Sequence, residues 1–193
     1  MKKLILASAS PRRSEILRAA GIRFEVRPTD TDESVPAGTP TSEAVCIIAG
    51  RKCRAAATAA ERPAAGDEIY ILAADTAVEC YGETLGKPHD RDDARRMLSM
   101  LAGCGSAVHT GFSVMRLSDG AEASGVETTY VTFDGMSADE IEDYISTDEP
   151  YDKAGAYGIQ GAGALLIKGI VGDYYTIMGF PVAAVARFLG VIK

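Results

Sequence analysis

Histidine and cysteine are scarce in this chain of 193 residues, and their positions exclude several common chemistries. The two histidines, His89 and His109, show neither the spacing of a zinc site nor the arrangement of a catalytic triad. The four cysteines form no C-x-x-C pair, so we expect reduced, free thiols rather than a disulfide framework.

Longer motifs and long apolar runs are also missing. The absence of G-x-x-x-x-G-K-[ST] excludes a P-loop, and the absence of G-x-S-x-G argues against a nucleophile-elbow hydrolase. No apolar run approaches the length that is needed to cross a membrane. The short run at residues 4–7 is followed almost at once by Arg12-Arg13, unlike a signal peptide. We therefore expect a cytoplasmic protein with no membrane partner.

Positive charge is not in excess. The 20 lysines and arginines are outnumbered by 27 aspartates and glutamates, which gives a formal net charge of −7. This balance argues against a nucleic-acid partner bound through a broad basic surface. A small anion is still compatible with it, because a local cationic pocket or a bound Mg²⁺ ion can supply positive charge.

The sequence does contain an alternation of strand and helix patterns, in an ordinary globular composition with 47% hydrophobic residues. We expect an α/β fold with a mixed, twisted sheet flanked by helices, as one domain over residues 1–193. A later β-hairpin region is expected to form a second lobe, and the cleft between two lobes is the default place for a ligand. The predicted strands are 4–7, 24–26, 68–78, 107–117, 122–133 and two strands flanking Gly172-Asp173. The predicted helices start at Pro11, near Thr39 or Thr41, at Arg91, Ala138 and Pro181, with caps at Ser10, Asp90 and Ser137.

The segment SASPRR joins the first strand to the first helix. A helix N-terminus offers free N–H donors, Ser8 and Ser10 add hydroxyls, and Arg12 and Arg13 add forked, permanently charged donors that fit phosphate oxygens. The pattern therefore predicts an anion site. A capped surface helix with two solvated arginines is an equally good interpretation of this segment alone.

Two acidic segments are candidates for the chemistry. Asp75, in AADTAV, is expected at the end of a buried strand, where a carboxylate is costly unless it meets a cation or a metal. The alternative is an aspartate that caps the next turn. Asp32 and Glu33 could supply a second carboxylate for a hard cation, although alone they are typical of a solvated acidic loop.

Two lysines complete the cationic candidates. Lys52 lies on the apolar face of the second predicted helix, where it must reach out to water or meet an anion. Lys87 stands between a glycine and a proline in LGKP. A single lysine is usually solvated, so the two are meaningful only in combination with the other residues.

The segment DKAGAYGIQG is too specific for a linker. Its glycines permit close approach of the backbone to a ligand, and Gln160 carries both a donor and an acceptor that can read a base edge. Tyr157 offers a ring for stacking. A merely flexible loop is the alternative interpretation.

Together these motifs resemble the Maf family of nucleoside triphosphate pyrophosphatases. The resemblance runs along nearly the whole chain, through LILASASPRRSEIL, Asp32-Glu33, GRKCRA, AADTAV, LGKP, HTG, EPYDKAGAYGIQG and GDYYTIMGFP. It implies an inosine-triphosphatase-like fold and hydrolysis of a nucleoside triphosphate to the monophosphate and pyrophosphate, aided by Mg²⁺ or Mn²⁺. SPRR, ADT and GIQG are the forms of the branch that acts on dTTP and UTP rather than on 7-methyl-GTP.

Residue roles follow from the same resemblance. It implies that Asp75 is the proton acceptor, or else a metal ligand together with Glu33. The implied specificity positions are Arg12, Thr76 and Gln160, and the implied phosphate-binding residues are Ser8, Arg13, Lys52 and Lys87. The chain departs from the family pattern at Gly50-Arg51 and at Met178-Gly179-Phe180; we expect neither to touch a residue with a role, and so only to tune activity.

The expected mechanism is metal-assisted attack of water at the α-phosphorus. The alternative is a regulator of cell division that binds nucleotide without essential catalysis, and a homodimer is compatible with the apolar strands of the hairpin region. Asp75, Glu33 and Lys87 favour the enzyme, because a binding protein has no need of the base.

Overall fold

The computed structural model describes residues 2–61, 63–64 and 67–190, and its strands form a seven-stranded sheet. The strand order is β2-β1-β3-β5-β6-β7, with β4 paired to β3. The sheet is mixed, because β1 runs parallel to β2 and β3 whereas the β3–β4 and β6–β7 pairs are antiparallel. The strands are β1 (Lys2–Leu6), β2 (Glu25–Val26), β3 (Glu68–Cys80), β4 (Glu83–Leu85), β5 (Gly105–Arg116), β6 (Glu122–Phe133) and β7 (Ile167–Val171).

Helices are interspersed among these strands along the chain, and three short 3-10 helices make up much of the glycine-rich segment. The expected mixed α/β fold, with helices flanking the sheet, is confirmed. The helices are α1 (Pro11–Ala19), α2 (Thr41–Ala59), α3 (Arg91–Leu101), α4 (Ala138–Ile145), η1 (Glu149–Asp152), η2 (Ala154–Ala156), η3 (Gly161–Leu166), α5 (Tyr174–Ile177) and α6 (Val182–Phe188).

The chain divides into two compact units, and β3, β5 and β6 contribute residues to both. Unit 1 consists of the residues up to Asp75, Thr110–Glu127 and the residues from Gly179 onward. Unit 2 consists of Thr76–His109 and Thr128–Met178. The cleft that the sequence predicts between two lobes stays a prediction, and so does the single domain over residues 1–193.

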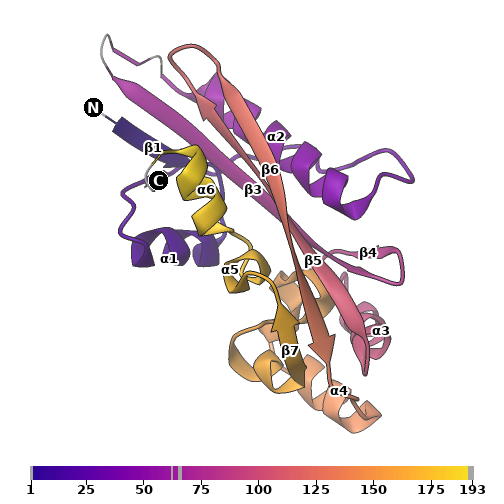
Figure 1. Ribbon diagram of the computed structural model, residues 1–193. Helices are drawn as coiled ribbons and strands as arrows, with labels where there is room; N and C mark the ends of the chain where they lie inside the picture. Colours follow the sequence, from indigo (N-terminus) through magenta and orange to yellow (C-terminus); the bar gives the residue numbers. More distant parts are fainter. Residues whose placement is uncertain (1, 62, 65–66, 191–193) are drawn as a thin grey trace. The chain divides into compact units, whose positions relative to one another are not determined.

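In unit 1, α2 packs on the sheet strands β1 and β3, which lie side by side (Figure 1). Ile5 of β1, Ile71 of β3 and Cys53 of α2 belong to one buried cluster. The helix backbone also approaches β5 closely, because a Cβ at Gly111 would lie 2.6 Å from the carbonyl oxygen of Val45. A glycine at this position therefore lets α2 sit directly on the sheet.

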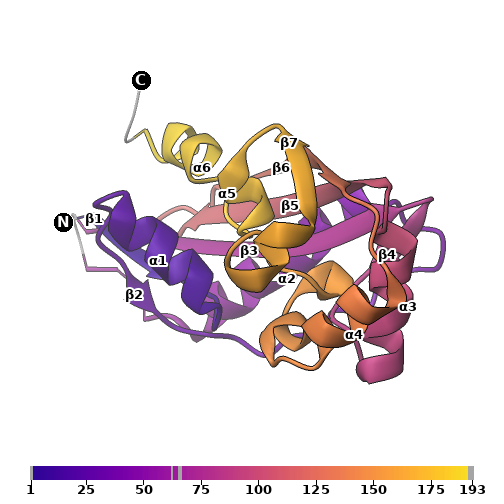
Figure 2. The same ribbon diagram turned by 90° about the horizontal axis from the view of Figure 1, so that it is seen from below.

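In unit 2, α3 and α4 pack beside each other (Figure 2) over a core that includes Leu98, Phe133 and Ile141. Tyr157 belongs to this core: its ring meets that of Phe133 edge-to-face at a centroid distance of 4.8 Å, and the residue is only 4% exposed. The interpretation of Tyr157 as a ring that stacks on a ligand is therefore wrong, because its faces are covered by the protein interior.

Several local signals in the sequence act as expected. The Asp90 side chain accepts a hydrogen bond from the backbone N–H of Asp93 at the start of α3, and Ser137 and Glu140 form a complete capping box at α4. Gly21, beyond the end of α1, has a φ of +70°. Ser10 does occupy the N-cap position of α1, but its side chain makes no capping hydrogen bond.

Two elements differ from the predictions. The segment after Gly172-Asp173 is the short helix α5 and not a strand, because the Asp173 carboxylate accepts hydrogen bonds from the N–H groups of Tyr175 and Thr176 and starts a helical turn. Asp75 lies inside β3 rather than at a strand end. The strand continues past it to Cys80 because β4 folds back and pairs with residues 78–80.

Candidate active site

Lys52 lies at the centre of the candidate site in unit 1. Its ammonium nitrogen is 2.7 Å from a carboxylate oxygen of Asp75 and 2.7 Å from a carboxylate oxygen of Glu33. Three different elements supply these groups: α2 carries Lys52, β3 carries Asp75, and the loop between β2 and α2 carries Glu33. The apolar face of α2 thus delivers the lysine to two anions instead of burying it unpaired.

The three side chains differ in exposure. Those of Lys52 and Asp75 are 12% and 16% exposed, whereas that of Glu33 is 59% exposed. Asp75 is costly to shield from water without a cation nearby, and Lys52 provides that cation. Glu33 completes the cluster from the solvent side.

Arg13 is held at two of its nitrogens in the same unit. Its Nη1 donates to the hydroxyl oxygen of Ser8 at 2.9 Å, and its Nε donates to the backbone carbonyl of Gly179 at 2.8 Å. Ser8 is buried, and its hydroxyl oxygen also accepts a hydrogen bond from the N–H of Ser10 at 3.2 Å. Because both acceptors belong to the folded interior, the guanidinium plane is set by the protein before any ligand arrives.

The charges around Arg13 connect it to the lysine cluster. Burial lowers the pKa of Arg13, and the neighbouring positive charge of Arg12 lowers it further, whereas attraction to the carboxylates of Asp75 and Glu33 acts in the opposite direction. Arg13 therefore shares an electrostatic environment with both acidic groups. The predicted anion site at SASPRR and the predicted acidic site at Asp75 are parts of one arrangement.

The contact between Arg13 and Gly179 contradicts one expectation. Met178-Gly179-Phe180 departs from the family pattern and was expected to touch no residue with a role, but the Gly179 carbonyl binds the Arg13 side chain directly. The expectation fails because Arg13 and Gly179 are separated by 166 positions, and no local pattern reports such a contact.

Arg51, in the other departure, supports the Glu33 loop from α2. Its guanidinium donates to the backbone carbonyls of Asp32 and Ser34, the two neighbours of Glu33. The Asp32 carboxylate in turn accepts from the backbone N–H and the hydroxyl of Ser34, which closes a tight turn. The acidic loop is therefore organised rather than simply solvated.

The remaining predicted residues lie in unit 2 or on the surface of α1. Thr76 follows Asp75 in β3 and is half-buried, while Lys87 and Gln160 are exposed. Arg12 is half-buried in the first turn of α1. The structure brings together Ser8, Arg13, Glu33, Lys52 and Asp75 within unit 1; the roles implied for Arg12, Thr76, Lys87 and Gln160 stay predictions.

Sequence reasoning assigned no role to Glu149, whose carboxylate lies inside the glycine-rich loop of unit 2 and accepts hydrogen bonds from the N–H groups of Ala162 and Gly163. The signal was present in EPYDKAGAYGIQGAG. A run of glycines exposes several backbone N–H groups, and an acidic residue in the same segment can satisfy them.

Two further observations concern the part of the chain that the structure describes. Within it, no three side chains among histidine, cysteine, aspartate and glutamate gather as a ready metal-ligand set. None of the helices in the described ranges combines the length and the apolar character that spanning a bilayer requires.

Comparison with known proteins identifies the family. A sequence model described as Maf-like protein matches residues 3–192, and the chain belongs to the Maf family. A relative from Moorella thermoacetica, named dTTP/UTP pyrophosphatase, is 44% identical over 99% of this chain and 95% of its own length. A relative of the same name from Bacillus velezensis is 45% identical over 97% of this chain and 95% of its own length.

Solved structures give more distant similarities. The Ham1 protein of Staphylococcus aureus is 16% identical, with a TM-score of 0.46 over 68% of this chain and 71% of its own. A nucleoside-triphosphatase, or dITP/XTP pyrophosphatase, from Mycobacterium abscessus is 13% identical, with a TM-score of 0.41 over 98% of this chain and 97% of its own.

Proposed function

We propose that this chain is a nucleoside triphosphate pyrophosphatase that hydrolyses dTTP and UTP to the monophosphate and pyrophosphate. The observation that carries the proposal is the cluster in which Lys52 binds both Asp75 and Glu33. Arg13, whose side chain is oriented by hydrogen bonds to Ser8 and Gly179, belongs to the same unit. The names of relatives that align over nearly the full length supply the substrates. A mostly shielded carboxylate next to fixed cations is the arrangement that hydrolysis of a polyanionic ester requires.

The cationic residues would bind the triphosphate. Arg13 offers a forked guanidinium whose orientation is already fixed, so little side-chain entropy is lost when phosphate oxygens replace water around it. Ser8 adds its hydroxyl, and Lys52 and Lys87 add point charges. Neutralising the triphosphate in this way makes attack by an electron-rich oxygen possible and stabilises the leaving pyrophosphate.

Asp75 would act on the attacking water. Its carboxylate orients or deprotonates the water, whose oxygen forms a bond to the α-phosphorus. The bond from that phosphorus to the oxygen bridging to the β-phosphate breaks, and pyrophosphate leaves with the electron pair. Lys52 keeps the carboxylate in place during this step, because it bonds one carboxylate oxygen at 2.7 Å.

A divalent cation, Mg²⁺ or Mn²⁺, fits the donor set. Asp75 and Glu33 present carboxylate oxygens that converge on one cation, the Lys52 ammonium, and hard cations bind one or two such carboxylates together with substrate phosphates. When bound, the ion would add positive charge against the triphosphate. Two protein carboxylates are too few to complete the coordination of such a cation, so the phosphates of the nucleotide would supply further oxygen ligands.

Base recognition is assigned to Arg12, Thr76 and Gln160. Gln160 is exposed at the start of η3 and carries both a donor and an acceptor, as a pyrimidine edge requires.

We also propose that the chain forms one domain and assembles as a homodimer. It would act in the cytoplasm, with no nucleic-acid or membrane partner.

The decisive experiment measures pyrophosphate release with Mg²⁺ from dTTP, UTP, CTP, the purine triphosphates and 7-methyl-GTP. We expect dTTP and UTP to be preferred. Asp75→Asn keeps the shape of the side chain but removes the charge, so we expect kcat to fall by about 100-fold or more with the fold intact. Asp30→Asn, a change in the exposed loop that carries Glu33, is the matched control and should remain active.

Three results would contradict parts of the proposal. A fully active, folded Asp75→Asn variant would remove Asp75 from the mechanism. Preference for 7-methyl-GTP would keep the chemistry but overturn the roles of Arg12, Thr76 and Gln160. Nucleotide binding without pyrophosphate release by the folded wild-type protein would favour the regulator of cell division.

A further inference from the structure

The carboxylate of Glu149 occupies the inside of the glycine-rich loop in unit 2. One of its oxygens accepts the backbone N–H of Ala162 at 3.0 Å, and the other accepts the backbone N–H of Gly163 at 3.0 Å. These donors lie 13 and 14 positions further along the chain. A single side chain thus ties the start of the segment to its end.

Tyr144, on α4, extends this arrangement to the other side of the loop. Its hydroxyl donates to Glu149 at 3.0 Å and accepts the backbone N–H of Gly158 at 3.2 Å. The side chain is part of the buried core of unit 2, so the hydroxyl is anchored to a rigid element. Burial raises the pKa of Tyr144, which keeps the phenol protonated as the donor to Glu149.

The glycines of this loop are explained by the carboxylate and the phenol. A Cβ at Gly161 would lie 2.6 Å from an oxygen of Glu149, and a Cβ at Gly163 would lie 2.7 Å from the Tyr144 hydroxyl. A Cβ at Gly158 would lie 3.0 Å from Glu149 as well. Backbone without side chains can therefore close around the carboxylate, whereas any other residue would push it out.

The electrostatics agree with a carboxylate held in its ionised form. Burial acts to raise the pKa of Glu149, but the hydrogen bonds from Gly163, Ala162 and Tyr144, together with the charge of Lys153, outweigh it and hold the pKa below its usual value. Lys153 also donates to the backbone carbonyl of Glu149 and pairs with the Asp152 carboxylate.

Gln160 lies between the fixed points. The N–H of Gly158 is bound two positions before it, and those of Ala162 and Gly163 are bound two and three positions after it. Gln160 itself is exposed and has extended backbone dihedrals, with φ −107° and ψ 164°. These bonds of Glu149 and Tyr144 to the N–H groups of Gly158, Ala162 and Gly163, together called the clamp, fix the backbone from which the exposed Gln160 side chain projects.

We infer that Glu149 is a positioning residue for substrate selectivity: with Tyr144 it holds the loop 158–163 so that the Gln160 amide is presented in one orientation to a pyrimidine base. The inference rests on the proposed function, in which Gln160 reads the base. Glu149 itself touches no substrate. It acts through the backbone on either side of Gln160.

The test compares Glu149→Gln with Gln160→Ala, and Glu142→Gln is the control. Glutamine keeps the length of the side chain but removes its charge and one acceptor oxygen. Glu142 is a carboxylate of the same unit whose ion pairs go to Arg91 and Arg95 and not to the loop. In the full chain, backbone hydrogen exchange of residues 158–163 and kcat/KM for dTTP, UTP and CTP are measured for all variants.

We expect Glu149→Gln to accelerate exchange in the loop by about tenfold or more, since charge-assisted hydrogen bonds are lost. The preference for dTTP and UTP over CTP should fall toward the value for Gln160→Ala. Glu142→Gln should change neither quantity. If Glu149→Gln does not fold, Tyr144→Phe removes the bonds to Glu149 and Gly158 and should give the same two effects.

Each of the other outcomes would overturn a particular part of the inference. Unchanged exchange in Glu149→Gln overturns the clamp. If Glu149→Gln exchanges faster but keeps its selectivity, while Gln160→Ala loses selectivity, the positioning role of Glu149 is overturned. Unchanged selectivity in Gln160→Ala also overturns that role, because Gln160 then does not read the base. If the wild-type protein hydrolyses none of the nucleotides, the proposed function fails, and with it the selectivity role; the exchange measurement still decides whether the clamp exists.

Discussion

At the residue scale, Arg13 shows how a phosphate-binding side chain is prepared. A solvated arginine samples many rotamers, and ordering it on binding is costly. Here Ser8 and Gly179 accept hydrogen bonds from two different nitrogens, so the protein has already met that cost during folding. The Ser8 hydroxyl is close to the sequence position of Arg13, but the Gly179 carbonyl comes from the far end of the chain.

A prediction at this scale concerns Gly179, whose φ of +93° is a conformation that side chains with a Cβ rarely adopt. Gly179→Ala should cost about 1 kcal/mol of stability and turn the carbonyl away from Arg13. We expect kcat/KM for dTTP to fall by about tenfold, mainly through KM, because a binding contact is loosened.

Gly38→Ala provides the matched control, since Gly38 lies in unit 1 with a φ of +83° and has no atom within 4 Å of an added Cβ. It should lose a similar amount of stability and keep its activity. Steady-state kinetics and urea unfolding measure both quantities. Equal activity in the two variants would show that Gly179 has no special connection to Arg13.

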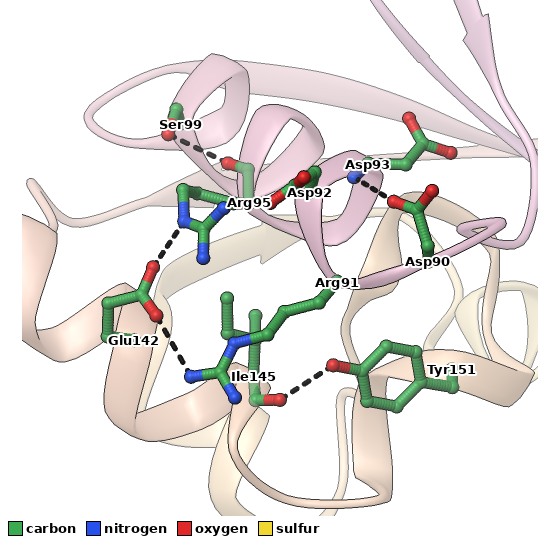
Figure 3. A network of polar contacts seen from close by, with 9 residues as sticks. All are labelled: Asp90, Arg91, Asp92, Asp93, Arg95, Ser99, Glu142, Ile145 and Tyr151. Atoms are coloured by element: carbon green, nitrogen blue, oxygen red, sulfur yellow. Dashed lines mark hydrogen bonds and ion pairs between the residues drawn. The ribbon is translucent and has the colours of Figure 1, made fainter.

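At the element scale, α3 and α4 are joined by a network of ion pairs around Glu142 (Figure 3). Its carboxylate binds Arg91 at 2.9 Å and also binds Arg95, both from α3. In the same view the Tyr151 hydroxyl donates to the carbonyl of Ile145 at 2.7 Å, where α4 ends. One acidic residue thus links two helices that pack over the core of unit 2.

The network predicts an acid-sensitive contribution to stability. The guanidinium groups of Arg95 and Arg91 lower the pKa of Glu142 to about 2, from a model-compound value of 4.5. A carboxyl with a lowered native pKa contributes stability above its unfolded pKa, and this contribution is lost as the pH falls from about 4.5 toward 2. Glu142→Gln should therefore be less stable than the wild type at pH 7.

Urea unfolding at a series of pH values measures this difference, which should shrink as the pH drops below 4.5. Asp143→Asn, at the next position of α4, is the control, because the ion pairs to Arg91 and Arg95 belong to Glu142, and the same gap is not expected for it. A gap between wild type and Glu142→Gln that is constant with pH would mean that the ion pairs contribute nothing measurable.

At the element scale, the sequence predicted where several helices begin but not how far the strands extend. The Ser137–Glu140 capping box was legible because its hydrogen bonds join residues three positions apart. The true length of β3 was not, because its last residues, 78–80, pair with β4, and the sequence does not show that pairing. Likewise, Asp173 starts a helical turn where a strand is predicted from the sequence.

At the scale of the whole molecule, binding of the nucleotide should stabilise the fold, because a ligand that binds only the native state shifts the unfolding equilibrium. Asp75→Asn should bind dTTP with Mg²⁺ and turn it over far more slowly than the wild type. At 100 times the Kd the gain is about 2.7 kcal/mol, which for a chain of this size raises Tm by about 5–10 °C.

Thermal unfolding of Asp75→Asn with and without dTTP measures this shift. The comparison is the double variant Asp75→Asn with Arg13→Gln. Its Tm should rise much less on addition of dTTP, because it lacks the guanidinium that Ser8 and Gly179 orient. An equal shift in the two proteins would remove Arg13 from the binding site. A larger shift with 7-methyl-GTP than with dTTP would contradict the proposed substrate class.

The sequence by itself determined the family, the caps at Asp90 and Ser137, and the residue types of the site. Motifs and caps depend on chemistry within a few positions, so they can be read without coordinates.

Only the tertiary structure decided that Lys52 binds Asp75 and Glu33, that Gly179 holds Arg13, and that Glu149 closes the glycine-rich loop. These contacts join groups from 13 to 166 positions apart, and they exist because elements far apart in the sequence pack against one another within each unit. Packing of this kind depends on all the surrounding side chains together, so no single stretch of sequence contains it.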